Sequence, residues 1–233
     1  MMKSFVILVL ALVCSNATAP PAEHSRFRRK IEKTKVKVGE SAFLENFQTF
    51  VADQSILVPS NLPNGNHKFK FDARNDHAKT LVVDDAAGPI QGYLLQASAD
   101  SQNQIALPAN EDNYYMFTAL LSGCQFIAYG PDNRHVTVEH NNCISSPCPA
   151  VNDAGYEGRL AAVRAENHPF IWVVSGVFGD RANEAAAPNA AGDGYTYGNL
   201  YGGQVVGKFT QAGGWVFTLR DNTMGNNGAV YHS

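Results

Sequence analysis

Short runs of alternating apolar and polar residues, separated by turn residues, most strongly limit what this chain can fold into. A period of two is typical of half-buried β-strands, because successive side chains of a strand point to opposite faces. Turn signals such as Asn64-Gly65-Asn66 and Gly88-Pro89 separate the runs. The strands that this pattern predicts are His67–Phe71, Thr80–Val83, Gly92–Ala97, Tyr114–Leu121, Cys124–Tyr129, Val136–His140, Gln204–Thr210 and Trp215–Arg220.

Three further segments complete the expected architecture. Ser41–Ala52 carries apolar residues at helical spacing, which predicts an amphipathic helix with Ser41 as its N-cap. Phe170–Phe178 is continuously apolar and of strand length, so we expect a strand that is buried on both faces. Asp180–Tyr197 is rich in Ala, Asn and Gly and is expected to be a long loop. These elements predict one domain, a two-layer and mostly β sandwich with one or two helices.

The amino-terminal residues have the anatomy of a secretory signal peptide. A weakly positive start is followed by the apolar run Phe5–Val13 and then by small residues at Ser15, Ala17 and Ala19. The apolar run is too short to span a bilayer. We expect cleavage after Ala17, which makes residues 1–17 the signal peptide and the protein secreted; a retained membrane anchor is the alternative.

A basic cluster, Arg26-Phe27-Arg28-Arg29-Lys30, follows the expected cleavage point. Arg-x-Arg-Arg is the pattern that subtilisin-like processing proteases read, so residues 18–29 are a candidate pro-segment. The alternative is an ordinary solvated basic stretch. In either case residues 30–233 are expected to contain the folded domain.

The charge of the chain excludes some classes of partner. The formal net charge is −3, with 18 Lys and Arg against 21 Asp and Glu. Proteins that bind nucleic acids or acidic membranes carry a basic surface, and this composition predicts none. We expect no nucleic-acid partner and no stable membrane association, and we expect the protein to be a monomer.

The cysteines single out one thiol. The chain has four cysteines, and Cys14 leaves with the signal peptide. Cys143 and Cys148 enclose a short turn-forming loop and are natural partners for a disulfide. Cys124 is then left as a free thiol, which is either reactive or inert and buried. Zinc is the alternative for these cysteines, but four ligands at a recognisable spacing are lacking, so we expect no metal.

The hairpin after Cys124 determines which residue faces the thiol. Gly130-Pro131-Asp132-Asn133 is a strong turn signal between two strand-like runs. A three-residue loop from Pro131 to Asn133 would place Cys124 directly opposite His140, with their Cβ atoms about 4.5–5.5 Å apart. A two- or four-residue loop would place Asn141 there instead. The predicted pair therefore depends on the length of the loop.

The alternation also predicts that this pair lies at the edge of the core. A thiol beside a histidine can lose its proton well below its usual pKa, and the histidine then protonates a departing amine. Ser122 and Gly123 form a tight turn whose N–H groups are candidates for an oxyanion hole. The alternative is a core cysteine and a core histidine that face each other by chance. The side chains expected to face the core are Cys124, Phe126, Ala128, Val136, Val138 and His140.

The sequence around Cys124 resembles the LSGC motif of bacterial glutamine deamidase toxins. Leu121-Ser122-Gly123-Cys124 supplies the motif, and His140 follows at the end of a strand. The family includes the cytotoxic necrotizing factors and Burkholderia lethal factor. The closer likeness is to Burkholderia lethal factor, where a Phe-Thr pair precedes the motif as Phe117-Thr118 does here. Weaker similarity lies within residues 195–210, beyond the segment 112–142 that carries the motif.

This resemblance implies an α+β fold, a β-sandwich of mixed sheets flanked by helices, for a deamidase-like catalytic domain over residues 30–233. It implies Cys124 as nucleophile, His140 as base and Thr118 as a polar neighbour that supports the site. The family reaction converts a protein glutamine to glutamate through a thioester and releases ammonia, without a cofactor. The expected partner is a host or target-cell protein that carries a reactive glutamine.

The chain also departs from the family pattern. His140 lies farther from the cysteine than the histidine of Burkholderia lethal factor does, although the necrotizing factors also have a longer gap. The predicted secretion and disulfide suit an extracellular route better than action where the protein is made. The targets of the known toxins are therefore not carried over to this chain.

Two other functions remain open on the sequence. A related cysteine amidase or transglutaminase would use the same residues, and the transglutaminase would use an amine in place of water as the acceptor. A non-catalytic secreted β-sandwich, such as a lectin-like or adhesive domain, would bind its ligand through exposed Tyr195, Tyr197 and Tyr201 in a Gly-rich stretch.

Overall fold

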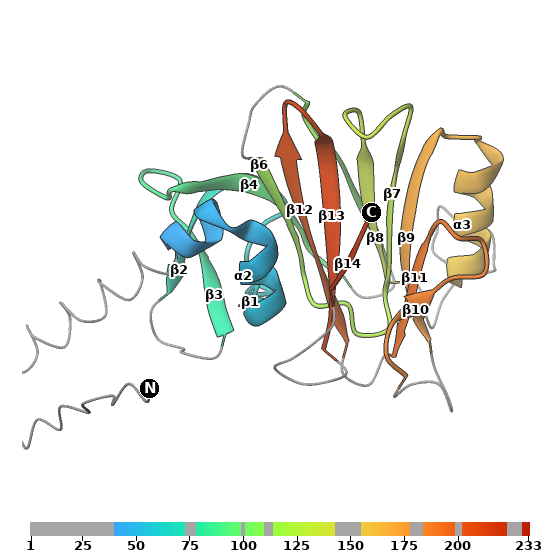
Figure 1. Ribbon diagram of the computed structural model, residues 1–233, viewed down its shortest axis with the longest axis horizontal. Coiled ribbons are helices and arrows are strands. Elements are labelled where there is room, and N and C mark those ends of the chain that lie inside the picture. The colour runs from blue at the N-terminus through green and yellow to red at the C-terminus, as the bar shows by residue number, and fades with distance from the viewer. Residues whose placement is uncertain are drawn as a thin grey trace, which may run out of the picture.

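A computed structural model of the protein describes residues 40–72, 78–98, 101–109, 114–142, 155–177, 184–198, 202–222 and 230–233. Within these residues the chain forms two β-sheets that face each other, with helices against their outer faces (Figure 1). The α+β sandwich of mixed sheets expected for a single domain is therefore confirmed. The predicted signal peptide, the candidate pro-segment and the predicted Cys143–Cys148 disulfide lie outside the described residues.

The larger sheet has eight strands and is mixed. The pairs β1–β3 and β4–β6 are parallel, and the other neighbours are antiparallel. The hairpin of β12 and β13 confirms the last pair of strands expected from the sequence. The strand order is β1 (Ser55–Leu57), β3 (Ala78–Val83), β2 (Gly65–Asp72), β4 (Ile90–Leu95), β6 (Tyr114–Thr118), β12 (Gly203–Thr210), β13 (Gly214–Asp221) and β14 (Val230–His232).

The smaller sheet has six strands, of which β9 and β11 are parallel neighbours and the rest are antiparallel. Its order is β10 (Ala187–Pro188), β11 (Gly194–Gly198), β9 (Phe170–Val177), β7 (Gln125–Gly130), β8 (Thr137–Asn141) and β5 (Gln102–Ala106). The prediction of a loop over Asp180–Tyr197 is wrong for β10 and β11. The reason is that Tyr195 and Tyr197 alternate along β11 and pack against the core between the sheets.

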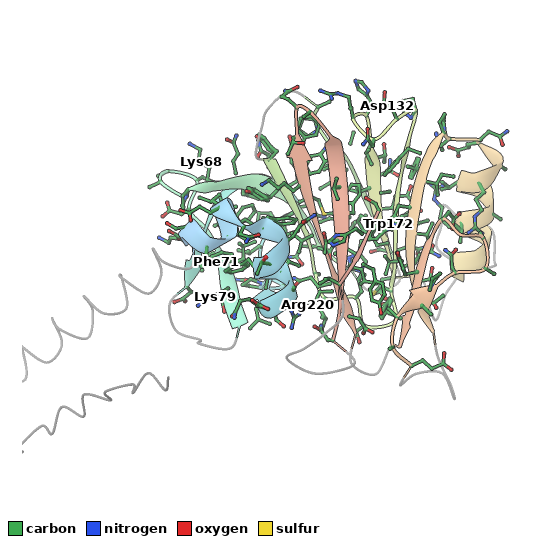
Figure 2. The ribbon with its side chains drawn as sticks, in the orientation of Figure 1. Lys68, Phe71, Lys79, Asp132, Trp172 and Arg220 are labelled. Atoms are coloured by element: carbon green, nitrogen blue, oxygen red, sulfur yellow. The ribbon has the colours of Figure 1, made fainter. Side chains whose placement is uncertain are left out.

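The main core fills the space between the two sheets, and aromatic rings dominate it. Trp172 of β9 stacks on Phe217 of β13 with the ring centroids 5.9 Å apart, and Phe217 stacks on Trp215 at 6.0 Å. Figure 2 labels Trp172 in this layer. The next residue, Val173, points to the other face and packs against α3 (Gly155–Ala165). β9 is therefore covered on both faces, as its continuous apolar sequence predicted.

A second core lies on the outer face of the larger sheet, under residues 40–45 and α2 (Phe47–Asp53). Phe43 is at its centre, with ring centroids 5.6 Å from Phe47, 5.3 Å from Phe50 and 5.5 Å from Phe71. The apolar stripe expected along Ser41–Ala52 is therefore confirmed as a packing surface.

The helix expected over Ser41–Ala52 is divided into two pieces. Ser41 lies within helical backbone, so its predicted role as N-cap is wrong. The backbone leaves the helical conformation at Asn46, with φ −139° and ψ 65°. Phe43 and Phe47 from the two pieces then meet edge to face over the same sheet.

A third cluster joins α3 to the outer face of the smaller sheet. Leu160 and Val163 of α3 pack against Ile127, Tyr129 and Val173. This helix was not expected from the sequence. None of the described helices is both long enough and apolar enough to span a bilayer.

An ion pair is buried in this third layer. Glu139 of β8 is fully buried, and Arg159 of α3 donates from Nε to its Oε2 at 2.8 Å and from a second nitrogen to its Oε1. The Tyr129 hydroxyl donates to the same carboxylate at 2.6 Å. Burial and the bond to Glu139 raise the pKa of Tyr129 above its usual value, so the hydroxyl keeps its proton. These three groups fix α3 to the strand that carries the next residue, His140.

Candidate functional site

The hairpin that joins β7 to β8 has a longer loop than the sequence predicted. Phe126, not Cys124, pairs with His140, and Gln125 pairs with Asn141. The predicted three-residue loop and the predicted direct Cys124–His140 pair are therefore wrong. Continued by one residue, this register places Asn142 opposite Cys124.

Side chains inside the loop explain its length. Asp132, labelled at the hairpin tip in Figure 2, accepts the backbone N–H groups of Arg134 and His135 at 2.8 Å each. The neighbouring sheet holds the same loop, because the Trp215 N–H donates to the Asn133 carbonyl at 2.7 Å. These contacts stabilise a wider turn than the Pro-Asp-Asn sequence alone suggests.

The two-residue shift leaves the predicted faces unchanged, because the side-chain period of a strand is two. Cys124, Phe126 and Val138 all belong to the core between the sheets. Since Phe126 and His140 are paired, His140 lies on this same face. Cys124 and His140 are therefore diagonal neighbours, a relation in which Cα atoms are about 7–8 Å apart.

The backbone of Cys124 is fixed from two neighbouring strands. Its carbonyl accepts the Gly176 N–H of β9 at 3.2 Å and the Tyr197 hydroxyl of β11 at 2.8 Å. Gly123, immediately before it, has φ +84°, a conformation that glycine adopts without strain. Two backbone hydrogen bonds between Leu121 and Gly203, at 2.7 and 2.9 Å, join the start of the turn to the larger sheet.

The Cys124 thiol is free and almost completely buried, with 4% of its surface exposed. Its sulfur donates a hydrogen bond to Asn142 Oδ1 at 3.3 Å. Burial raises the pKa of the thiol, and the backbone of Ser122 opposes this shift. In this arrangement the thiol is therefore protonated at neutral pH.

His140 is fully buried, and neither of its ring nitrogens has a hydrogen-bond partner within the described parts of the chain. Burial lowers its pKa to about 4, and the Leu95 backbone, which approaches the ring without the geometry of a hydrogen bond, partly opposes the shift. The ring is therefore uncharged at neutral pH and can act as a base. A buried polar group without a partner destabilises a fold, which makes His140 a candidate for a functional rather than a structural residue.

Thr118 supports the wall of the site and does not contact the sulfur in any described interaction. Its buried hydroxyl donates to the Val205 carbonyl at 3.1 Å and accepts the Val205 N–H at 3.2 Å. Thr118 also pairs with Leu95 across β6 and β4. Because the Leu95 backbone acts on His140, Thr118 helps to hold the part of the larger sheet that faces the histidine.

Asn142 is a site residue that was not expected from the sequence. Besides accepting the thiol, it donates from Nδ2 to the Ser98 carbonyl at 3.1 Å, and its backbone N–H donates to the Ser101 carbonyl at 2.9 Å. Only the true length of the preceding loop reveals that this residue faces Cys124.

The remaining predicted residues are only partly described. Ser122 is exposed and Gly123 is buried beside the thiol, but an oxyanion hole formed by their N–H groups stays a prediction. Tyr197 is fully buried with its hydroxyl on the Cys124 carbonyl, so it does not belong to the exposed tyrosine surface that a binding module would need. Within the described residues, no cluster of three or more His, Cys, Asp or Glu side chains could hold a metal ion.

Alanine at Gly176 is expected to disturb the turn that carries the thiol. An added Cβ would lie 2.8 Å from the Cα of Gly123, which is closer than real Cβ contacts. We expect Gly176→Ala to lower the free energy of unfolding by about 1–3 kcal/mol, because the added methyl group would force the backbone at Gly123 to move. Urea unfolding measures this change, and labelling of Cys124 by a thiol reagent should become faster.

Gly213→Ala is the matched control, since its Cβ would meet only the Thr210 hydroxyl, at 3.2 Å. Equal stability losses in the two variants would contradict a specific close contact between β9 and the turn.

Comparisons with known proteins give a fold and no family. No family model matches the chain, and no curated protein matches its sequence. Among solved structures, it is similar to the crystal structure of the C-terminal domain of CNFy from Yersinia pseudotuberculosis, with a TM-score of 0.54 and 11% sequence identity. The similarity covers 88% of this chain and 98% of that one, so the two share an overall fold.

Proposed function

We propose that this protein is a glutamine deamidase that acts on another protein as a secreted toxin or effector, with Cys124 as nucleophile and His140 as base. The observation that carries the proposal is the free Cys124 thiol and the uncharged, unpartnered His140 on one core face, beside the turn with the LSGC sequence. This site lies in a fold similar to the C-terminal domain of a cytotoxic necrotizing factor.

Two separate lines support the same family. The sequence motif and the threonine before it resemble the deamidase toxins over a short segment. The fold comparison covers most of the chain at only 11% identity, so it owes little to that segment. Fold similarity at this level does not carry an activity. The catalytic proposal therefore rests on the residues at the site.

The chemistry follows from the two side chains. Cys124 passes its proton to His140, and the thiolate attacks the side-chain carbonyl carbon of the substrate glutamine. The imidazolium returns the proton to the departing nitrogen, which leaves as ammonia, and a thioester remains. His140 then takes a proton from a water molecule while the oxygen of that water attacks the thioester. The proton returns to the sulfur as glutamate is released.

The low pKa of His140 is compatible with this role. A ring with a pKa of about 4 is uncharged at neutral pH and therefore available as a base. A thiolate at Cys124, the diagonal neighbour of His140, would favour the imidazolium, since a nearby opposite charge stabilises the charged form. Thr118 keeps the facing strand in place, and the turn of Ser122 and Gly123 is the candidate for binding the oxyanion.

Secretion completes the proposal. A signal peptide over residues 1–17 and a Cys143–Cys148 disulfide are both suited to an oxidising compartment outside the producing cell. The substrate is then a protein of a target cell rather than a protein of the producer.

Mass spectrometry of target-cell lysate tests the proposal. Purified protein should convert specific glutamines to glutamate with release of ammonia, and Cys124→Ala should reduce the rate by on the order of a thousandfold or more. Adding a primary amine separates deamidation from transglutamination, because only a transglutaminase would attach the amine. Conversion at an equal rate by a folded Cys124→Ala protein would refute the assignment of the nucleophile.

A further inference from the structure

The hydrogen bond between Cys124 and Asn142 exists only while the thiol is protonated. The sulfur lies 3.3 Å from Asn142 Oδ1, which can accept a hydrogen bond but cannot take the proton. A thiolate would have nothing to donate and would face the negative end of the amide dipole. This contact therefore stabilises the neutral form of the nucleophile and disfavours the charged form.

The orientation of the Asn142 amide is fixed by its own contacts. Its Nδ2 donates to the Ser98 carbonyl at 3.1 Å, which leaves Oδ1 for the sulfur. Its backbone N–H donates to the Ser101 carbonyl at 2.9 Å. Asn103 steadies the same segment, because its Nδ2 donates to the Gln96 carbonyl at 2.8 Å and to Ser98 Oγ at 3.2 Å. The amide is thus held in place before any substrate binds.

We propose that Asn142 is a positioning residue that holds the Cys124 thiol in a protonated resting state and releases the sulfur toward His140 when the proton leaves. This inference rests on the proposed function, because it is the proposed reaction that requires the sulfur to lose its proton. It assigns a role to Asn142, which lies opposite Cys124 because the hairpin loop is longer than predicted.

Few other groups around the sulfur can shift the pKa of the thiol. His140 reaches this face from β8, and Tyr197 of β11 donates to the Cys124 carbonyl rather than to the sulfur. Within the part of the chain that the structure describes, no charged side chain shifts the pKa of the thiol. Asn142 is therefore the polar side chain with a direct hydrogen bond to the sulfur at rest.

The test is the pH dependence of Cys124 alkylation by iodoacetamide, followed at the Cys124 peptide by mass spectrometry. Asn142→Asp keeps the shape but places a carboxylate beside the sulfur. We expect it to raise the apparent pKa of alkylation by about one to two units, which slows alkylation at pH 8 by about tenfold or more. Asn142→Ala removes the acceptor, and we expect it to lower the apparent pKa by about half a unit.

Asn64→Asp is the matched control. Its Oδ1 accepts the Gln96 N–H at 2.6 Å, and a carboxylate can keep this bond while it adds the same charge at an exposed position that has no hydrogen bond to the sulfur. We expect it to leave the alkylation profile unchanged. A general loosening of the fold would expose the thiol and shift both Asn142 variants in one direction. Shifts of the same sign, or none, would overturn the assignment of Asn142.

The outcome is separable from that of the proposed function, because alkylation needs no substrate. Opposite shifts without any glutamine conversion by the native protein would support the contact with Asn142 and refute the deamidase. Glutamine conversion with an unchanged alkylation profile in both variants would refute the role of Asn142 and leave the deamidase standing.

Discussion

Arg159→Met is expected to lower the free energy of unfolding by about 3–5 kcal/mol, because it leaves a buried carboxylate without its cation. Glu139 has no exposed surface, and Arg159 contributes two of the three hydrogen bonds that its carboxylate receives in the described contacts. Tyr129 alone cannot balance the charge. Urea unfolding at neutral pH measures the loss.

The double variant Glu139→Gln with Arg159→Met is the control for this prediction. It removes both charges and keeps the Tyr129 hydroxyl beside an amide oxygen, so its loss should be well below that of Arg159→Met alone. A double variant that is as unstable as the single one would show that packing, not the unpaired charge, dominates.

This ion pair also matters to the candidate site. Glu139 and His140 are consecutive in β8 and therefore point to opposite faces of the smaller sheet. The contact with α3 on the outer face fixes the strand that presents His140 on the inner face. The alternation that places His140 toward the core places Glu139 away from it, but it does not predict that a helix covers Glu139.

The strands and their faces could be predicted, whereas the exact pairing at the site could not. Alternation along Cys124–Tyr129 and Val136–His140 separates the face toward the core between the sheets from the face toward α3, and a shift of two residues preserves it. The length of the intervening loop depends on Asp132 and on a hydrogen bond from Trp215, a residue more than seventy positions later. Such a tertiary contact leaves no local pattern in the sequence.

The helix α3 shows the same limit. Its sequence GYEGRLAAVRA has glycines at two of its first four positions and only two large aliphatic residues, Leu160 and Val163, so its apolar periodicity is weak although its Ala, Leu, Arg and Glu residues favour a helix. Contacts with the sheet stabilise it: Arg159 reaches Glu139, and Arg164 donates to both carboxylate oxygens of Asp193 at 2.8 Å. These partners are brought together only by the fold.

His140→Leu is expected to remove the proposed activity while the protein remains folded. Loss of a general base reduces a rate by about 100- to 10,000-fold. At neutral pH the free energy of unfolding should stay equal or rise, because the change replaces two buried nitrogens without partners by an apolar side chain of similar size. Activity and stability would then move in opposite directions, as expected at a functional site. Full activity in this variant would exclude His140 as the base.

The loss of stability at acid pH is a second test of His140, and the direction of this change follows from the pKa of the ring. In the folded protein the ring titrates at about 4 rather than 6.5, so between these values the unfolded chain binds more protons. Stability should therefore fall as the pH drops through this range, by about 3 kcal/mol from His140 alone.

Urea unfolding at pH 7, 5 and 4 should show that His140→Leu lacks this loss, whereas His135→Leu, on the exposed hairpin loop, controls for loss of a histidine elsewhere. If the free energy of unfolding of His140→Leu falls as steeply at acid pH as that of the native protein, the ring of the native protein is hydrated or hydrogen-bonded. A ring in such surroundings would not be the neutral, desolvated base that the proposed reaction requires.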